Sequence, residues 1–234
     1  MGLSIAYKLG LPAATDRETV MRRVEQLRER ARQLPFALVT EMMVSNRDEP
    51  LGTSGPEGIE LEFWYRSWAN LTLHASSESQ GETLPESIGF VIYPGKECEP
   101  AAFGMAWSPP RGEDWNALPD QPFTWCWQSA CKTQYASIVS SEHFLSCHTS
   151  LVALLDAARE LGFDVTVFDE GGYWESRDAD RLLAQVETMN QLMAGFAGML
   201  HDEMGDEHSI DAAIFSHPDF ERLETKAMAP PPED

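Results

Sequence analysis

The sequence predicts an α+β protein: one mostly antiparallel sheet of about six to seven strands, with three main helices packed on one face. First, short segments that alternate apolar and polar residues follow one another through the middle of the 234-residue chain, without helical segments between them. Second, three longer segments repeat apolar residues at steps of three and four. Because a doubly wound parallel sheet needs a helix between consecutive strands, we expect the order β-α-β-β-β-β-β-α-β-α.

The chain begins with a predicted strand and helix. Residues 3–11 alternate apolar and polar side chains, and Pro12 ends the strand. Thr15 or Asp16 can cap a helix that runs to Leu34. One side of this helix is apolar and is expected to be buried, with Val20, Val24, Leu27, Ala31 and Leu34. The other side is expected to be solvated and carries Arg17, Arg22, Arg23, Glu25, Arg28, Glu29, Arg30 and Arg32.

The middle of the chain has the pattern of successive strands. Apolar or alternating segments predict strands at 35–45, within 59–75, at 87–93 and at 101–107. Clusters of Gly, Pro, Asn, Asp and Ser between them predict loops, and residues 108–122 form the longest, with four prolines.

In the last third, strands and helices alternate. A strand at 124–136 precedes a helix that begins near Ser140 or Ser141 and ends at Gly162. A short strand, FDVTVF, leads to the turn DEGGYWE, and a last helix begins at Ser176 or Asp178. That helix has a heptad-like apolar seam of Leu182, Val186, Met189, Met193, Phe196 and Leu200. The seam is expected to pack on a sheet or another helix, so both a monomer and a homodimer are compatible with it.

Two parts of the chain differ in composition. Residues 1–204 are expected to form a single α+β domain. Residues 205–234 are rich in acids and end in MAPPPED, which predicts an acidic C-terminal extension that is partly helical and then disordered.

Charge and cysteine content narrow the class of function. The formal net charge of -21 would repel nucleic acid and anionic membrane surfaces, whereas a protein partner, especially a basic one, or a small polar ligand is compatible. No apolar run is long enough to span a membrane, and the N-terminus lacks the pattern of a signal peptide. The four cysteines follow no disulfide framework. We therefore expect a soluble, acidic, cytoplasmic protein with reduced thiols and no cofactor.

The segment 123–177 holds most of the residues able to do chemistry. A strand that ends in two acids, turns through two glycines and enters a helix places polar groups at a sheet edge, where ligand sites often form. If the strand at 124–136 neighbours FDVTVF, its polar end lies beside these acids. The candidate ligand-binding residues are Lys132, Gln134, Tyr135, Asp169, Glu170, Gly171, Gly172, Tyr173 and Trp174. The alternative is a tight structural turn whose acids stabilise the following helix.

Two functions remain open for this segment. The first is a binding module for a protein or small ligand. The second is a small hydrolase or transferase in which Lys132, Asp169, Glu170 and His143, with Cys147 as a further nucleophile, line an acidic and basic cleft. The motifs GxSxG, GxGxxG and HExxH and the Walker loop are absent from the sequence, so no specific reaction is indicated.

The cysteines and histidines of this segment permit one further alternative. Cys126, Cys131, His143 and Cys147 could form a Cys3His zinc site. However, Cys126 and Cys131 are five residues apart, so in a regular strand their side chains point to opposite faces. Free cysteine is also among the most often buried residues, so core cysteines and no metal are the expectation.

Overall fold

The computed structural model describes residues 3–45, 87–108, 122–204 and 213–228. Within them one antiparallel sheet has seven strands in the order β2-β4-β5-β6-β1-β7, with β3 also paired to β4. The predicted fold class is thus confirmed. The strands are β1 (Ser4–Gly10), β2 (Leu38–Val39), β3 (Met43–Ser45), β4 (Ser87–Tyr93), β5 (Ala101–Ser108), β6 (Thr124–Lys132) and β7 (Asp164–Asp169).

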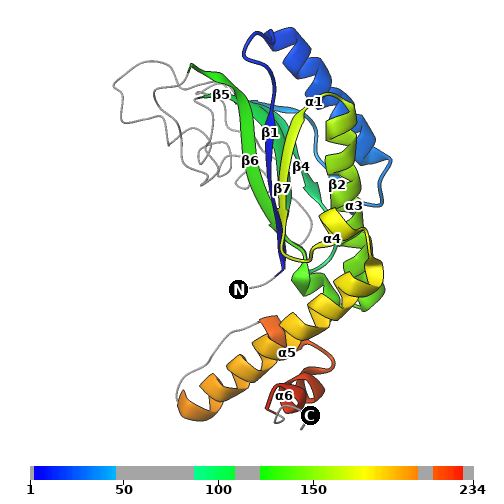
Figure 1. Cartoon of the computed structure of the whole chain (residues 1–234), viewed down its shortest axis with the longest axis vertical. Helices are drawn as coiled ribbons and strands as arrows, with labels where there is room; N and C mark the ends of the chain where they lie inside the picture. Colours follow the sequence, from blue (N-terminus) through cyan, green and yellow to red (C-terminus); the bar gives the residue numbers. More distant parts are fainter. Residues whose placement is uncertain (1–2, 46–86, 109–121, 205–212, 229–234) are drawn as a thin grey trace.

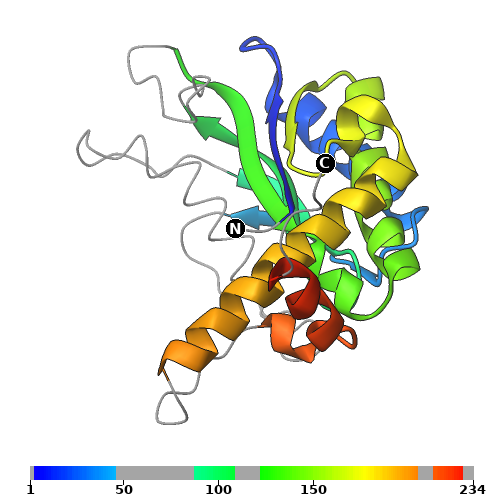
Figure 2. The ribbon, with the colours of Figure 1, turned by 60° about the horizontal axis from the view of Figure 1, so that its bottom comes forward.

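The helices lie on one side of the sheet or below its end (Figure 1). They are α1 (Arg17–Arg32), α3 (Ser141–Glu160), α4 (Tyr173–Ser176), α5 (Ala179–Met204) and α6 (Phe220–Met228), with 3-10 turns η2 (Gln134–Ile138) and η3 (Ala213–Ser216). Helices α1 and α3 cover one face of the sheet, as the second view shows (Figure 2). Helix α5 starts beside α3 and then extends away from the sheet, where α6 packs on it (Figure 1).

Some predicted features lie outside the described residues. These are the strands within 59–75, all but the ends of the loop 108–122, and parts of the acidic extension. The single strand expected at 35–45 is two short strands, β2 and β3, which both pair with β4. The strand expected at 124–136 ends at Lys132, because the backbone amides of Thr133 and Gln134 both donate to the carbonyl of Leu3.

Local signals start α1 and α3 where the sequence predicts. Asp16 caps α1 by accepting from the Thr19 amide at 2.9 Å, and Ser140 caps α3 by accepting from the His143 amide at 3.1 Å. Helix α3 ends before Gly162, whose φ of 81° is easy for a residue without a Cβ.

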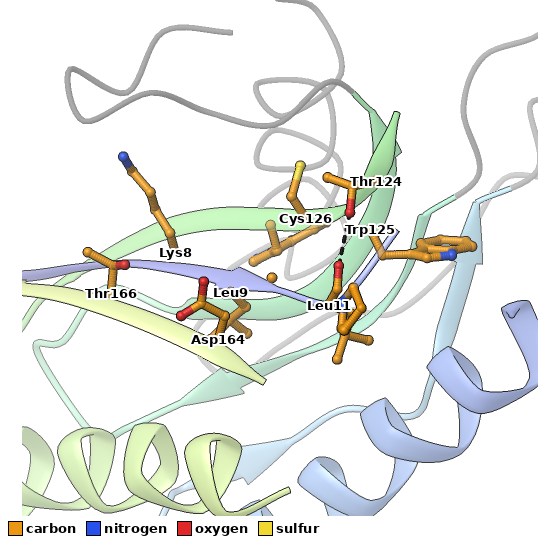
Figure 3. Close-up of a pocket in the computed structure, with 11 residues that line it drawn as sticks. Lys8, Leu9, Leu11, Thr124, Trp125, Cys126, Asp164 and Thr166 are labelled. Carbon is orange, nitrogen blue, oxygen red and sulfur yellow. Dashed lines mark hydrogen bonds between the residues drawn. The ribbon is translucent and has the colours of Figure 1, made fainter. Parts of the chain in front are cut away.

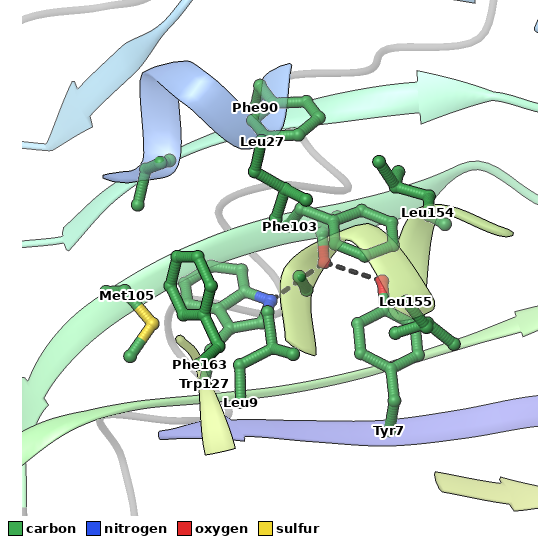
Figure 4. Close-up of a cluster of buried hydrophobic side chains, with 14 of the residues drawn as sticks. Tyr7, Leu9, Leu27, Phe90, Phe103, Met105, Trp127, Leu154, Leu155 and Phe163 are labelled. Atoms are coloured by element: carbon green, nitrogen blue, oxygen red, sulfur yellow. Dashed lines mark hydrogen bonds between the residues drawn. The ribbon is translucent and has the colours of Figure 1, made fainter. Parts of the chain in front are cut away.

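The core lies between the sheet and the two covering helices. Alternate residues of β1 point into it, and so does the apolar side of α1. The Tyr7 hydroxyl and the Trp127 indole nitrogen both donate to the Ala102 carbonyl, each at 2.8 Å, so their polar atoms are satisfied inside an apolar cluster (Figure 4).

One residue of α1 departs from the prediction. Arg28 falls on the side expected to be solvated, but it is only 4% exposed. Its Nε donates to the Thr40 carbonyl at 2.6 Å, and its guanidinium pairs with Glu41. Through these contacts, Arg28 holds the segment around Thr40 and Glu41 against α1.

Helix α5 divides its apolar seam between several environments. Leu182 and Val186 are buried near the start of the helix, whereas Phe196 is 55% exposed. In the second half, Ala194 and Ala197 face a small cluster formed with η3 and α6. Among the described residues, no helix combines the length and apolar character that a membrane crossing requires.

Candidate functional site

The acidic turn after β7 begins with a buried chain of polar groups. The Thr133 hydroxyl lies 2.9 Å from His148 Nδ1, and His148 Nε2 lies 3.2 Å from an oxygen of Asp169. Because an ionised carboxylate only accepts hydrogen bonds, His148 Nε2 carries a proton and its N–H donates a hydrogen bond to Asp169. Thr133 and His148 have no exposed surface, and Asp169 is 8% exposed.

Asp169 is fully engaged within the protein. Its two oxygens also accept from the backbone amides of Gly171 and Trp174, each at 2.8 Å. Burial of the carboxyl raises its pKa, but the hydrogen bonds from His148 and from these amides outweigh burial, and the net pKa is lowered. The hydroxyl, imidazole and carboxylate follow the order of an acyl-transfer triad, but the buried Thr133 oxygen offers no surface to a substrate.

Glu170 closes the other side of the turn. Its carboxylate accepts from the Ser4 amide at 2.8 Å and from the Ser4 hydroxyl at 2.6 Å. The two acids that suggested a ligand site therefore anchor the turn to β1 and α3.

Lys132 is separated from the acids by a strand. The sequence leaves open that β6 neighbours β7, but β1 lies between them and Ser4 is the register partner of Lys132. The Lys132 ammonium lies 4.7 Å from the centre of the Tyr135 ring. The condition for a shared cleft between these strands is therefore not met.

Gln134 belongs to the interior. Its side-chain oxygen accepts from the Leu3 amide, and its nitrogen donates to Asn190 of α5, both at 2.9 Å. Asn190 in turn donates to the Ser137 hydroxyl at 2.9 Å. This second buried network joins the residue before β1 to η2 and α5.

Gly171 and Gly172 are required as glycines for different reasons. A Cβ on Gly171 would lie 2.6 Å from a methyl group of Leu182, so the close approach is to the protein's own core. Gly172 has a φ of 67°.

The two aromatic residues of the turn also have partners within the protein. The Tyr173 ring meets the ring of His148 edge-on. Trp174 has the guanidinium groups of Arg159 and Arg177 over its ring, each at 4.7 Å.

The four cysteines are all buried, as expected for core residues. Cys126 and Cys131 do face opposite ways: Cys126 lies 3.0 Å from the Ser108 hydroxyl, and Cys131 donates to the Glu99 carbonyl on the helix-covered side. Among the described residues, no group of three or more His, Cys, Asp or Glu side chains is placed to hold a metal ion. His143 and Cys147 do meet, together with Cys98, which the sequence did not suggest as a partner.

A cavity opens where β1, β6 and β7 come together (Figure 3). It has a volume of about 390 Å³, and its lining includes Lys8, Gly10, Thr124, Asp164 and Thr166. Gly10 lies between Asp164 of β7 and Cys126 of β6 in the strand register. Because it has no side chain, nothing projects from this position of β1 into the cavity. Of the cavity lining, only the β6 and β7 residues lie in the predicted segment 123–177.

The sheet face that carries this cavity becomes more exposed toward β7. Every residue of β4 is buried, whereas Asp164, Thr166 and Phe168 of β7 are exposed. Phe168 is 62% exposed, an unusual value for an aromatic residue in a sheet. The alternation in DVTVFD could have indicated this, since it differs from a strand that is buried on both faces.

Comparisons with known proteins add no functional information. No family model matches the chain, and searches of curated proteins and of solved structures gave no match. We therefore infer function from the geometry of the residues alone.

Proposed function

We propose that this protein is a binding module that receives an extended, basic segment of a partner protein along strand β7. The observation that carries the proposal concerns β7, which among the described residues is the last strand of the sheet. The side chains on one of its faces are exposed, above all that of Phe168. A strand at a sheet edge can pair with a further strand through its backbone, and this mode of recognition is common for peptides.

The sequence of β7 supports pairing. It reads DVTVFD, rich in β-branched and aromatic residues, and it contains no Pro and no Lys, which often protect edges. Beside Phe168 lies Ala6, and beyond it Ala130, so a shallow apolar strip runs inward from the edge. A side chain of the added segment could pack there against the Phe168 ring.

Charge favours a basic segment over a second copy of β7. Asp164 opens the strand and Glu170 follows it, within a chain of net charge -21. Two β7 strands paired antiparallel would bring the Asp164 end of one toward the Asp169 and Glu170 end of the other. A segment with Lys or Arg in those places would instead be attracted.

The enzyme alternative has less support. Its acids, Asp169 and Glu170, already accept hydrogen bonds from within the protein, and Lys132 lies across β1 from them. A small polar ligand in the cavity beside Asp164 and Thr166 would use the same end of the sheet, and it becomes one outcome of the test.

The test is titration of the full chain with a peptide of about ten residues that alternates lysine and valine, followed by NMR of backbone amides. We expect the largest shifts at Val165–Phe168 and binding at least about tenfold weaker for Phe168→Ser. Phe196→Ser is the matched control, because Phe196 is 55% exposed on α5.

Three results would contradict the proposal. One is equal binding of a glutamate and valine peptide, and another is equal loss of binding in both Phe variants. The third is shifts confined to the cavity lining, at Lys8, Gly10, Thr124, Asp164 and Thr166, with Val167 and Phe168 unchanged, which would favour the cavity.

A further inference from the structure

The turn between β4 and β5 lies directly on the first half of α3. A Cβ on Gly95 would be 2.8 Å from Cys147 Sγ and 2.7 Å from His143 Cε1, so only glycine fits there without displacing them. Three residues later, Cys98 lies in the same buried cluster as Cys147, and the pKa shifts of the two thiols indicate a hydrogen bond between them. Packing of the turn on α3 thereby brings two cysteines distant in sequence together.

An imidazole adjoins this pair. His143 Nε2 lies 2.9 Å from the Lys96 carbonyl and 3.7 Å from Cys147 Sγ. Because a carbonyl oxygen only accepts, Nε2 carries the proton, and the same N–H lies near the sulfur. An N–H donor beside a sulfur stabilises its thiolate.

The backbone beside Cys98 is held in an uncommon conformation. Glu97 has a φ of 63°, in the left-handed region, where a residue with a Cβ is disfavoured. The Cys98 amide then donates to the Gly95 carbonyl at 3.1 Å. This turn directs Cys98 inward toward α3, and such strained positions often accompany function.

The two thiols are not equivalent. The hydrogen bond from Cys98 lowers the pKa of Cys147 despite its burial. The same hydrogen bond, together with burial, raises the pKa of Cys98. Cys147, which also has the His143 N–H beside its sulfur, is therefore the better nucleophile of the pair.

We propose that Cys147 and Cys98 form a site of reversible oxidation by hydroperoxides, with Cys147 as the attacking sulfur and Cys98 as the resolving sulfur. The Cys147 thiolate attacks the terminal oxygen of the hydroperoxide and the O–O bond breaks. The leaving alkoxide or hydroxide takes up the proton released from Cys147. The sulfur is oxidised to a sulfenic acid, and the hydroperoxide is reduced to an alcohol or water.

The second step joins the two segments. Cys98 sulfur attacks the sulfenic sulfur of Cys147, the S–O bond breaks, and the departing hydroxide leaves as water with the Cys98 proton. The disulfide links the β4–β5 turn to α3, and a thiol reductant reverses it by exchange. His143 is the positioning residue that favours the Cys147 thiolate.

The experiment treats the reduced full chain with one equivalent of hydrogen peroxide and maps its peptides by mass spectrometry. We expect a Cys98–Cys147 disulfide as the first product, removed by dithiothreitol. Cys98→Ser should instead accumulate Cys147 sulfenic acid, captured by dimedone, and His143→Gln should form the disulfide several-fold more slowly. Cys126→Ser is the matched control, because Cys126 is buried on the opposite face of the sheet and should leave the rate unchanged.

Oxidation of Cys126 or Cys131 before the Cys98–Cys147 pair would overturn the proposal. So would thiols that react only after denaturation, or a His143→Gln rate equal to that of the unmodified chain. The peptide map of the unmodified chain decides the matter even if Cys98→Ser fails to fold.

Discussion

Two networks that join a carboxylate to nitrogen donors have similar geometry but lie in very different surroundings. At the end of the sheet, His148 and Asp169 are 3.2 Å apart and their side chains have no exposed surface. Between α5 and α6, Glu187 pairs with Arg222 and Lys226, each at 3.0 Å, but the three side chains are 39% to 48% exposed. The distances in the two networks are nearly equal. We therefore expect burial to decide how much each network contributes to stability.

The two networks differ in whether water can replace a partner that is removed. When an exposed partner is removed, solvent satisfies the group that remains, and such pairs contribute about 1 kcal/mol or less. When a buried partner is removed, the remaining groups lose hydrogen bonds that water cannot restore. The buried network should therefore contribute strongly to the stability of the acidic turn. The exposed network should add only slightly to the packing of α6 on α5.

The largest expected effect follows from removing Asp169. Asp169→Ala leaves His148 and the amides of Gly171 and Trp174 without their acceptor, and should lower the free energy of unfolding by about 3–5 kcal/mol. Denaturation by urea measures it. Asp164→Ala, at the exposed start of the same strand, is the control and should change stability by about 0.5 kcal/mol or less. An equal effect of the two variants would remove the distinction between the networks.

A smaller effect is expected at the neutral buried network. Asn190→Ala removes the acceptor of the Gln134 side-chain nitrogen and a donor to the Ser137 hydroxyl, and should cost about 1–3 kcal/mol. The control is Thr188→Ala, two residues earlier and exposed on α5. If Asn190→Ala proved as mild as its control, water would have to reach Gln134.

The smallest effect belongs to Glu187, whose pKa is lowered to about 2 by hydrogen bonds from Arg222, Lys226 and Gln191 that outweigh its partial burial. Its folded pKa is below the unfolded value of about 4.5, so its contribution is complete above about pH 4.5 and is lost as the pH falls toward 2. Because the group is exposed, Glu187→Gln should cost about 1 kcal/mol or less near pH 6.

Salt and pH together test this assignment. The difference between the unmodified chain and Glu187→Gln should shrink in about 1 M salt and near pH 2. The effect of Asp169→Ala should survive the salt, since burial shields that pair from ions. The pKa of Asp169 is also lowered, so the contribution of its ionised carboxylate to stability is likewise lost on acidification, below about pH 4. A Glu187 contribution that grew on acidification and fell as the pH rose would contradict a lowered pKa.

Much of the fold could be predicted because its signals are local. Asp16, Ser140 and Gly162 mark helix ends through their own side chains or lack of one, and alternation along β1 identifies its buried face. The separation of Cys126 and Cys131 onto two faces followed from strand geometry alone. These features depend only on neighbours within a few residues.

The candidate site depended on contacts between distant segments. Whether Lys132 met Asp169 was a question of strand order, and β1 occupies the place between their strands. Cys98 lies in a turn and meets Cys147 only through packing of that turn on α3. The ligand-binding residues proposed from the sequence stay a prediction, as does the choice between monomer and homodimer.

The position of β1 in the sheet has a consequence for how the chain folds. Both neighbours of this strand come much later in the sequence: Gly10 pairs with Cys126 and with Asp164. During synthesis, β1 leaves the ribosome before the other strands of this sheet and has no strand partner until β6 emerges. Closing loops of more than a hundred residues is entropically costly, so such pairing slows folding. Strand β1 is thus made early and joined late. Until then the nascent chain must keep the five buried apolar side chains of residues 3–11 from other partners, namely Leu3, Ile5, Tyr7, Leu9 and Leu11.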